Sequence, residues 1–200
     1  MEQRTQEWFD ARKMKFTASR INELLGVKGL GLTGESYARD VAQEYFFDKE
    51  EMFVSNDMQR GIDLEPMAFD FIKQKFEKDF ISVENCGFFA VGEMGASPDG
   101  LIGDDAILEI KCPKQAKFLE VVETNKVDKK YYDQMQCQMY CTNRKKAYYL
   151  NYCIIDGIEY GHLIEVERDE ERIKLMIERV GQAVIIRDQI IENIKANKQW

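Results

Sequence analysis

The chain reads Ser97-Pro98-Asp99-Gly100-Leu101 and then, after a turn, Leu108-Glu109-Ile110-Lys111-Cys112, and these two segments decide its fold. Successive side chains on a strand point to opposite faces. Glu109 and Lys111 are therefore predicted to project together from one face, while the apolar residues that alternate with them face the core. If Asp99 ends the preceding strand of the hairpin, its carboxylate reaches the same face. The two segments thus predict two carboxylates and one lysine on an antiparallel hairpin.

This set of side chains points to phosphodiester hydrolysis. Paired carboxylates suit Mg²⁺, a hard ion that prefers oxygen ligands and keeps several waters. A lysine beside such an ion can orient or deprotonate an attacking water and offset charge on a phosphate. The alternative is a solvated strand edge, because a chain with 32% charged residues contains many short acidic and basic strings. The turn signal at Pro98-Asp99 favours the site, and with Glu109-Ile110-Lys111 it resembles the two halves of the PD-(D/E)xK nuclease motif.

Length and composition limit the class of protein. A chain of 200 residues fits a single domain, 1–200, and its 44% hydrophobic and 12% aromatic content excludes a disordered chain. No apolar run reaches the roughly 18 to 20 residues that span a membrane, and residues 1–4 lack the apolar core of a signal peptide. We therefore expect a cytoplasmic protein with no membrane partner.

The cysteines and the net charge argue against two further classes. Five cysteines without CxxC spacing, together with the single histidine His162, argue against a zinc site and predict reduced, mostly buried thiols. A net charge of −8 argues against a protein that coats nucleic acid through bulk electrostatics. It is compatible with an enzyme that focuses positive charge in a cleft around a metal.

Hydrophobic periodicity predicts helices on both sides of a strand-rich centre. The expected helices span 5–13, 17–25, 37–45, 56–78, 114–124, 129–142 and 170–198, and the expected strands span 80–91, 96–102, 106–112, 147–155 and 159–166. A glycine-rich loop is expected at 26–34, a helix kink near Ile62 caused by Pro66, and a hairpin turn at Asp156-Gly157. This order predicts an α/β (α+β) fold with a restriction-endonuclease-like core, in which helices flank a central mixed β-sheet.

Five motifs along the chain are informative as a set. They are Trp8-x3-Arg12-x4-Thr17-Ala18-Ser19, Gly61-x3-Glu65-Pro66, Ser97-Pro98-Asp99-Gly100, Glu109-x-Lys111 and Gln134-x-Gln136. Each is weak alone. In this order and without large gaps, they resemble the lambda-exonuclease/YqaJ viral recombinase family over nearly the whole chain.

The residue types at these positions fit nuclease chemistry, although each has a plainer explanation. Glu65 would bring a third carboxylate from a helix to the metal ligands, and the alternative is an ion pair between Glu65 and a nearby lysine. Arg12 is a planar, bidentate donor suited to phosphate oxygens. Ser19 lies next to a predicted helix N-terminus, where backbone N–H groups favour anions. Otherwise Arg12 is a surface residue and Ser19 a helix-cap residue.

The resemblance implies a role for each of these residues. Asp99, Glu109 and the Ile110 carbonyl would bind one metal ion, and Glu65 would assist a second. These acids would act in catalysis together with Lys111 and Gln134. The 5′-phosphate of DNA would be bound by a pocket of Arg12, Ser19 and Ser97. The family's glutamine pair maps to Gln134 and Gln136, and Gln134 is the one expected to reach the site. Gln138 shares a helix face with Gln134 by its i, i+4 spacing, and a polar helix face is its plainer explanation. Met58 is a candidate wedge at the end base pair.

The residues and the resemblance together predict a Mg²⁺-dependent, processive 5′→3′ exonuclease, with Mn²⁺ as a substitute ion. It would degrade one strand of linear double-stranded DNA and leave a 3′ single strand for an annealing protein. The resemblance further implies a phage or prophage protein in a bacterial cytoplasm, and a homotrimeric ring around DNA. The alternatives are a structure-specific or repair endonuclease with the same core, and a DNA-binding module without catalysis.

Overall fold

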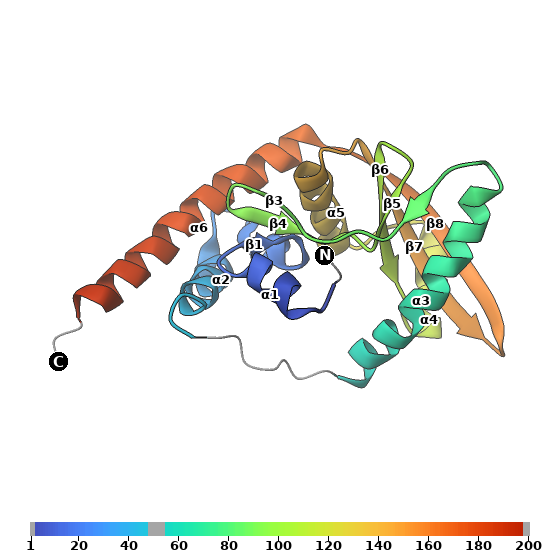
Figure 1. Cartoon of the computed structure of the whole chain (residues 1–200), viewed down its shortest axis with the longest axis horizontal. Helices are drawn as coiled ribbons and strands as arrows, with labels where there is room; N and C mark the ends of the chain where they lie inside the picture. The colour runs from blue at the N-terminus through green and yellow to red at the C-terminus, as the bar shows by residue number, and fades with distance from the viewer. Residues whose placement is uncertain (1–2, 48–54, 198–200) are drawn as a thin grey trace.

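A five-stranded mixed sheet forms the centre of the computed structural model, which describes residues 3–47 and 55–197 (Figure 1). In spatial order its strands are β2 (Val83–Glu84), β5 (Gly100–Ile102), β6 (Ala106–Lys111), β7 (Lys146–Ile155) and β8 (Ile158–Glu167). The β6–β7 pair is parallel, and the other neighbours are antiparallel. The predicted turn at Asp156-Gly157 joins β7 to β8, and both residues have positive φ, as a two-residue hairpin turn requires.

Helices cover both faces of this sheet. They are α1 (Gln6–Arg12), the 3₁₀ helix η1 (Ala18–Leu24), α2 (Gly31–Gln43), α3 (Asn56–Glu77), α4 (Gln115–Thr124), α5 (Lys129–Thr142) and α6 (Glu170–Ala196). Ile110 of β6 shares a buried cluster with Ile72 of α3, whereas Ile107 shares one with Met135 of α5. Because side chains alternate along a strand, Glu109 lies on the face covered by α5. The predicted mixed sheet flanked by helices is confirmed.

A second, three-stranded sheet lies beside the N-terminal helices. Its order is β1 (Phe16–Thr17), β4 (Met94–Ala96) and β3 (Phe89–Val91). β1 runs parallel to β4, with Thr17 opposite Gly95. Ser19 and Ser97 each lie two residues after this pair, so the parallel pairing brings both serines to the same edge of the sheet.

The strands around Pro98 differ from the prediction. The expected strand 96–102 is split, because β4 ends at Ala96 and β5 begins at Gly100 in the other sheet. The expected strand 80–91 is divided in the same way into β2 and β3. Pro98 cannot donate a hydrogen bond to a neighbouring strand. The break therefore falls where the chain passes from one sheet to the other.

The helices α2 and α3 compare differently with the prediction. α2 begins at Gly31, inside the expected glycine-rich loop. Gly34 serves close packing there, because a Cβ at this position would lie 2.9 Å from the Cβ of Leu30. α3 is one helix with Pro66 inside it, close to the expected range 56–78, and the kink stays a prediction.

The cysteines and the histidine have structural positions. All five cysteines are free thiols, and Cys137, Cys141 and Cys153 are buried, as predicted. His162 Nε2 lies 2.8 Å from Oδ1 of Asn125, the C-cap residue of α4. Within the described ranges, no helix combines the length and the hydropathy that crossing a bilayer requires.

Candidate active site

The β5–β6 hairpin holds Asp99 beside the strand that carries Glu109. The Asp99 N–H donates to the Leu108 carbonyl at 3.0 Å, and the Asp99 Oδ2 accepts the Ile110 N–H at 2.6 Å. Both bonds run to the main chain of β6, one residue before and one residue after Glu109. The Asp99 carboxylate is thereby fixed next to the strand of Glu109 and Lys111, as the sequence predicts.

Glu109 is a buried carboxylate whose two oxygens are both hydrogen-bonded. Its side chain is 1% exposed. Gln134 Nε2 donates to Oε1 at 2.7 Å, and Gln138 Nε2, one turn later on α5, donates to Oε2 at 2.6 Å. Lys111 Nζ forms an ion pair with Oε1. Burying a charge is costly unless it is paired and hydrogen-bonded, so these three partners offset the cost of burying Glu109.

Gln138 does not lie on a polar, solvated helix face, the plainer explanation for this residue. It is fully buried, and its Oε1 has no hydrogen-bond partner among the described residues. Its i, i+4 spacing from Gln134 is the sequence signal that places both amides on one side of α5. Gln136 points elsewhere, as predicted, because its Nε2 donates to the Glu167 carbonyl and its Oε1 accepts the Asp169 N–H, both at 2.8 Å.

Lys111 lies between the acids and an aromatic pair. Burial lowers the pKa of Lys111, but the charges of Glu109 and Asp99 outweigh burial, so its pKa is raised above the usual value. Its Nζ lies 5.0 Å from the centre of the Tyr131 ring, which stacks on Tyr149 at 6.0 Å. In this structure Lys111 is therefore a protonated ammonium in a defined position.

Asp99 responds to the same cluster of charges. Burial raises the pKa of Asp99 well above its usual value, and the charges of Glu109 and Glu65 add to that rise. Lys111 and the Ile110 N–H lower it without cancelling the rise. Three carboxylates thus act on one region, and their mutual repulsion favours a cation near them.

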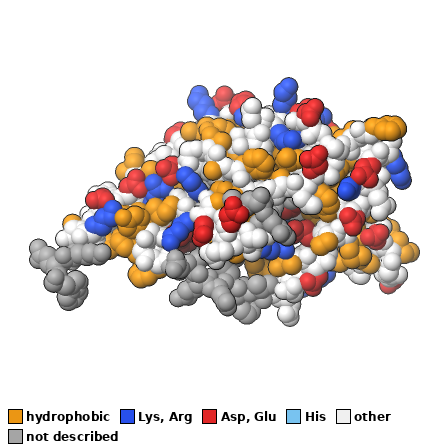
Figure 2. Space-filling view, viewed as in Figure 1, with side chains coloured by type: hydrophobic (Ala, Val, Ile, Leu, Met, Phe, Trp, Pro, Cys, Tyr) orange, Lys and Arg blue, Asp and Glu red, His pale blue; other side chains and the backbone are white. Residues whose placement is uncertain are grey.

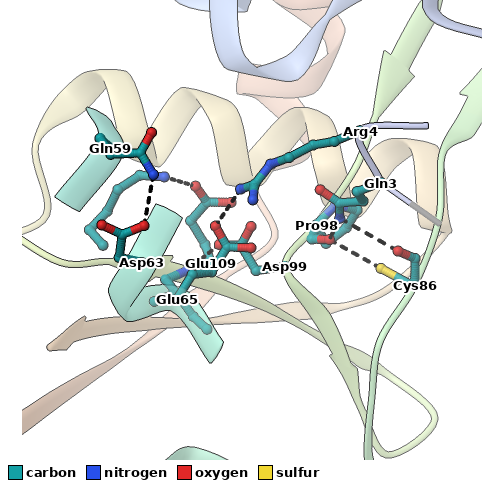
Figure 3. Close-up of polar contacts among 11 residues, drawn as sticks. Gln3, Arg4, Gln59, Asp63, Glu65, Cys86, Pro98, Asp99 and Glu109 are labelled. Atoms are coloured by element: carbon teal, nitrogen blue, oxygen red, sulfur yellow. Dashed lines mark hydrogen bonds and ion pairs between the residues drawn. The ribbon is translucent and has the colours of Figure 1, made fainter. Parts of the chain in front are cut away.

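Glu65 reaches this region from α3 and pairs with an arginine (Figure 3). Its Oε2 accepts a hydrogen bond from Arg4 Nη2 at 2.8 Å. The sequence leaves open an ion pair between Glu65 and a lysine, and the structure gives instead an arginine from the segment before α1. Figure 3 shows the Glu65 carboxylate beside those of Asp99 and Glu109.

The donor set fits a hard divalent cation. Asp99, Glu109 and Glu65 offer carboxylate oxygens, the ligands that Mg²⁺ and Mn²⁺ prefer. Acids that repel one another, as the raised pKa of Asp99 indicates, are stabilised by a cation. Within the described part of the chain, no three Asp, Glu, His or Cys side chains already stand in a ligating arrangement. Glu109 and Glu65 are instead paired with Lys111 and Arg4.

Arg12 is held over an aromatic ring that contacts Ser97. Its guanidinium carbon lies 4.0 Å from the centre of the Trp8 ring, and Trp8 Nε1 donates to Ser97 Oγ at 2.8 Å. Burial lowers the pKa of Arg12, against the opposite influence of Tyr37 and Glu44. Trp8 thus connects Arg12 to Ser97, two of the residues that the sequence assigns to one phosphate pocket.

Ser19 and Met58 are both exposed side chains. Ser19 is exposed, and its Oγ lies 3.4 Å from Thr17 Oγ1. The helix that begins beside it is a 3₁₀ helix of seven residues, so we expect only a small helix-terminus contribution to anion binding. Met58 lies in the first turn of α3 and is 47% exposed. Its wedge role stays a prediction.

Comparison with known proteins identifies relatives over most of the chain. Residues 7–145 match the YqaJ-like viral recombinase domain. An alkaline exonuclease from Laribacter hongkongensis, LHK-Exo, has 30% sequence identity and a TM-score of 0.81, over 96% of this chain and 97% of that chain. LHK-Exo in complex with dAMP gives 29% identity and a TM-score of 0.83 with the same coverage.

The fold is also found at lower sequence identity. A phage-related exonuclease from Haemophilus somnus 129PT shares the fold, with 17% identity and a TM-score of 0.72 over 93% of this chain and 99% of that chain. No curated protein sequence matches the chain. The five motifs of the sequence fall inside the matched range, 7–145, and the resemblance inferred from them is confirmed. The chain belongs to the YqaJ-like viral recombinase family.

Proposed function

We propose that this chain is a Mg²⁺-dependent, processive exonuclease that degrades the 5′-ended strand of linear double-stranded DNA. The observation that carries the proposal is the buried Glu109, held by Lys111 and two glutamines beside the anchored Asp99. Family membership and the similarity to an alkaline exonuclease support the reaction class.

The carboxylates would hold the cofactor. Asp99, Glu109 and the Ile110 carbonyl are the proposed ligands of one ion, and Glu65 would assist a second. Mg²⁺ is the proposed ion and Mn²⁺ a substitute, because the donors are oxygens. When bound, such an ion supplies charge stabilisation at the phosphate and a more acidic water.

Lys111 would activate the attacking water for in-line displacement at phosphorus. Its raised pKa keeps it protonated, so its N–H groups donate to the water or to a phosphate oxygen and offset the developing negative charge. Gln134 keeps Glu109 oriented through Oε1. Its amide can also hydrogen-bond a water or a phosphate without changing the charge of the site.

Arg12, Ser19 and Ser97 would bind the 5′-phosphate of the strand being degraded. The Trp8 ring lies 4.0 Å from the Arg12 guanidinium carbon and holds this planar donor near Ser97, and its N–H groups would bind phosphate oxygens. A terminal phosphate carries close to two negative charges near neutral pH, and a 5′-hydroxyl carries none. The pocket would therefore set the 5′→3′ direction, with Met58 as a wedge at the end base pair.

Assembly would explain processivity. A chain with a net charge of −8 needs a topological means of staying on DNA, and a homotrimeric ring provides one. The unit would be the single domain 1–200, encoded by a phage or prophage and active in the host cytoplasm, with an annealing protein as partner. Light scattering at micromolar concentration is expected to give a trimer of the 23.4 kDa chain. A monomer that degrades long duplexes processively would contradict the ring and leave the active site proposal intact.

The activity is tested with three substrates in parallel. They are a linear duplex with 5′-phosphates, the same duplex with 5′-hydroxyls, and a covalently closed circle, each with Mg²⁺ and with chelator. We expect the 5′-phosphorylated duplex to be degraded fastest, and degradation to occur with Mg²⁺ but not with chelator. Lys111→Ala should lose this activity. Lys114→Ala is the matched control, because Lys114 is exposed and pairs with Asp57.

Each of the other outcomes identifies an alternative. Cleavage of the circle at a comparable rate would replace the exonuclease with a structure-specific or repair endonuclease. Binding of all three substrates without cleavage in any divalent cation would indicate a DNA-binding module without catalysis.

A further inference from the structure

Arg4 lies at the acidic cluster formed by Glu65, Asp99 and Glu109, and it has no role in the function proposed above. Its Nη2 lies 2.8 Å from Glu65 Oε2. Figure 3 shows the Arg4 side chain extended toward the carboxylates of Glu65, Asp99 and Glu109. Arg4 comes from the N-terminal segment, and Glu65 from α3, so the contact joins parts of the chain that are distant in sequence.

The residues on both sides of Arg4 are held by hydrogen bonds of their side chains. Gln3 Nε2 donates to the Pro98 carbonyl at 2.8 Å, in the segment that leads to Asp99. Thr5 Oγ1 accepts the Trp8 N–H at 3.3 Å and caps α1. Arg4 itself has a φ of 68°, a left-handed conformation that costs free energy for a residue with a Cβ. These anchors hold the arginine in that conformation, directed at the site.

The Arg4–Glu65 ion pair is weak enough for Glu65 to exchange Arg4 for another cation. The two side chains are 49% and 34% exposed, and exposed ion pairs contribute little free energy. A divalent cation that binds Glu65 would replace Arg4 as its partner. The guanidinium would then be a cation beside the carboxylates with its planar donors available, and such donors bind phosphate oxygens bidentately.

We propose that Arg4 binds a phosphate of the DNA strand being cut, and that Arg4 and a divalent cation are alternative partners of Glu65. The inference rests on the proposed function, because it takes the carboxylate cluster as the site of cleavage. It implies that loading of Glu65 with a cation prepares Arg4 for substrate, so that the two binding events are coupled.

The test separates cation binding from DNA binding in Arg4→Gln. Mn²⁺ affinity is measured by calorimetry without DNA. The affinity for a 5′-phosphorylated duplex is measured by fluorescence anisotropy in Ca²⁺, at several salt concentrations and with the DNA checked to be intact. Lys73→Gln is the matched control, because Lys73 carries the same charge on α3 and pairs with Glu77 at 3.8 Å.

Arg4→Gln is expected to move the two affinities in opposite directions. Mn²⁺ should bind about two- to fivefold more tightly, because the competing cation is gone. DNA should bind about tenfold more weakly, and the slope of log affinity against log salt should fall by about 0.9, because one phosphate contact is lost. Arg4→Lys should recover part of the DNA affinity, and Lys73→Gln should change neither quantity.

Other results would overturn the inference. If both affinities are unchanged in Arg4→Gln, Arg4 is neither a competitor for Glu65 nor a ligand of DNA. If both affinities fall together with an unchanged salt slope, the role of Arg4 is structural. In either case wild-type protein that binds Mn²⁺ and cleaves DNA leaves the proposed function standing, whereas wild type that binds no divalent cation overturns the function itself.

Discussion

Glu109 and Glu65 belong to the same carboxylate cluster, but Glu109 is held by more partners and is more deeply buried than Glu65. Glu109 comes from the central strand β6, is 1% exposed, and is held by Lys111 and two glutamines. Glu65 comes from α3, is 34% exposed, and is held by Arg4 alone among the hydrogen bonds and ion pairs of the described residues. The contrast indicates a fixed side of the site, where Glu109 is already held in place, and an exchangeable side, where Glu65 can change its partner.

The largest effect is expected at Lys111, which belongs to the fixed side. Lys111→Ala removes one preorganised charged group, and such losses commonly cost about 10²- to 10³-fold in rate. We expect that loss or a larger one on the 5′-phosphorylated duplex, with Mn²⁺ affinity by calorimetry largely kept because the carboxylates remain. Asp99→Ala should instead weaken Mn²⁺ binding. Cleavage near the wild-type rate by Lys111→Ala would refute the proposed mechanism.

The next effect concerns recognition of the strand end, away from both glutamates. Arg12→Ala removes a charge-assisted contact to the 5′-phosphate, and such contacts contribute about 1.5 to 3 kcal/mol. Wild type should therefore degrade 5′-phosphorylated duplex at least about tenfold faster than 5′-hydroxyl duplex, and Arg12→Ala should lose most of this preference. Mn²⁺ affinity should not change. Equal rates on the two ends for wild type would contradict the pocket.

The sequence predicts the fixed side well, because that side depends on strand alternation and helical spacing, which are local patterns. Alternation along one strand places Glu109 and Lys111, and the turn at Pro98 brings Asp99 to the same strand. Helical spacing in the same way puts Gln134 and Gln138 on one side of α5. Whether that side faces solvent or Glu109 depends on how α5 packs on the sheet, and no local sequence pattern specifies this packing.

The arginine partner of Glu65 could not be predicted, because the contact joins residues that are distant in sequence. Arg4 and Glu65 are 61 residues apart, and nothing in either segment specifies the other. The two short strands on either side of Pro98 illustrate the same limit: their composition indicates strand, but membership of different sheets is decided by tertiary pairing. The split strand and the arginine partner of Glu65 are therefore findings of the structure alone.

A smaller effect is expected when the donors to Glu109 are removed one at a time. Gln138 is fully buried, so Gln138→Leu leaves Glu109 Oε2 without a donor, which costs about 1 to 3 kcal/mol of unfolding free energy. Gln134 is partly exposed, and water can replace it in Gln134→Leu at a lower cost. Urea unfolding in chelator measures both values. A cost for Gln138→Leu equal to or below that for Gln134→Leu would contradict the contrast in burial.

The smallest effect is expected from the charge of Asp99 in metal-free protein. Its pKa is raised in the folded state, so the group stabilises the fold while protonated and loses that contribution as the pH rises through the raised value. Ionised Asp99 therefore destabilises the fold near neutral pH. Asp99→Asn removes the charge and can keep an acceptor for the Ile110 N–H. In chelator at pH 7 it should melt about 2 to 4 °C higher than wild type, for a gain of about 1 kcal/mol.

Acid and excess Mg²⁺ should both remove this advantage of Asp99→Asn. The difference in melting temperature should shrink as the pH falls, because the wild-type carboxyl then becomes protonated. In excess Mg²⁺ the order should invert, because wild type alone gains the full free energy of binding the ion. Glu65→Gln, at the half-buried carboxylate, is the matched control and should shift the melting temperature less. If Asp99→Asn melts at or below wild type in chelator at pH 7, the three carboxylates do not repel one another strongly enough to select a cation.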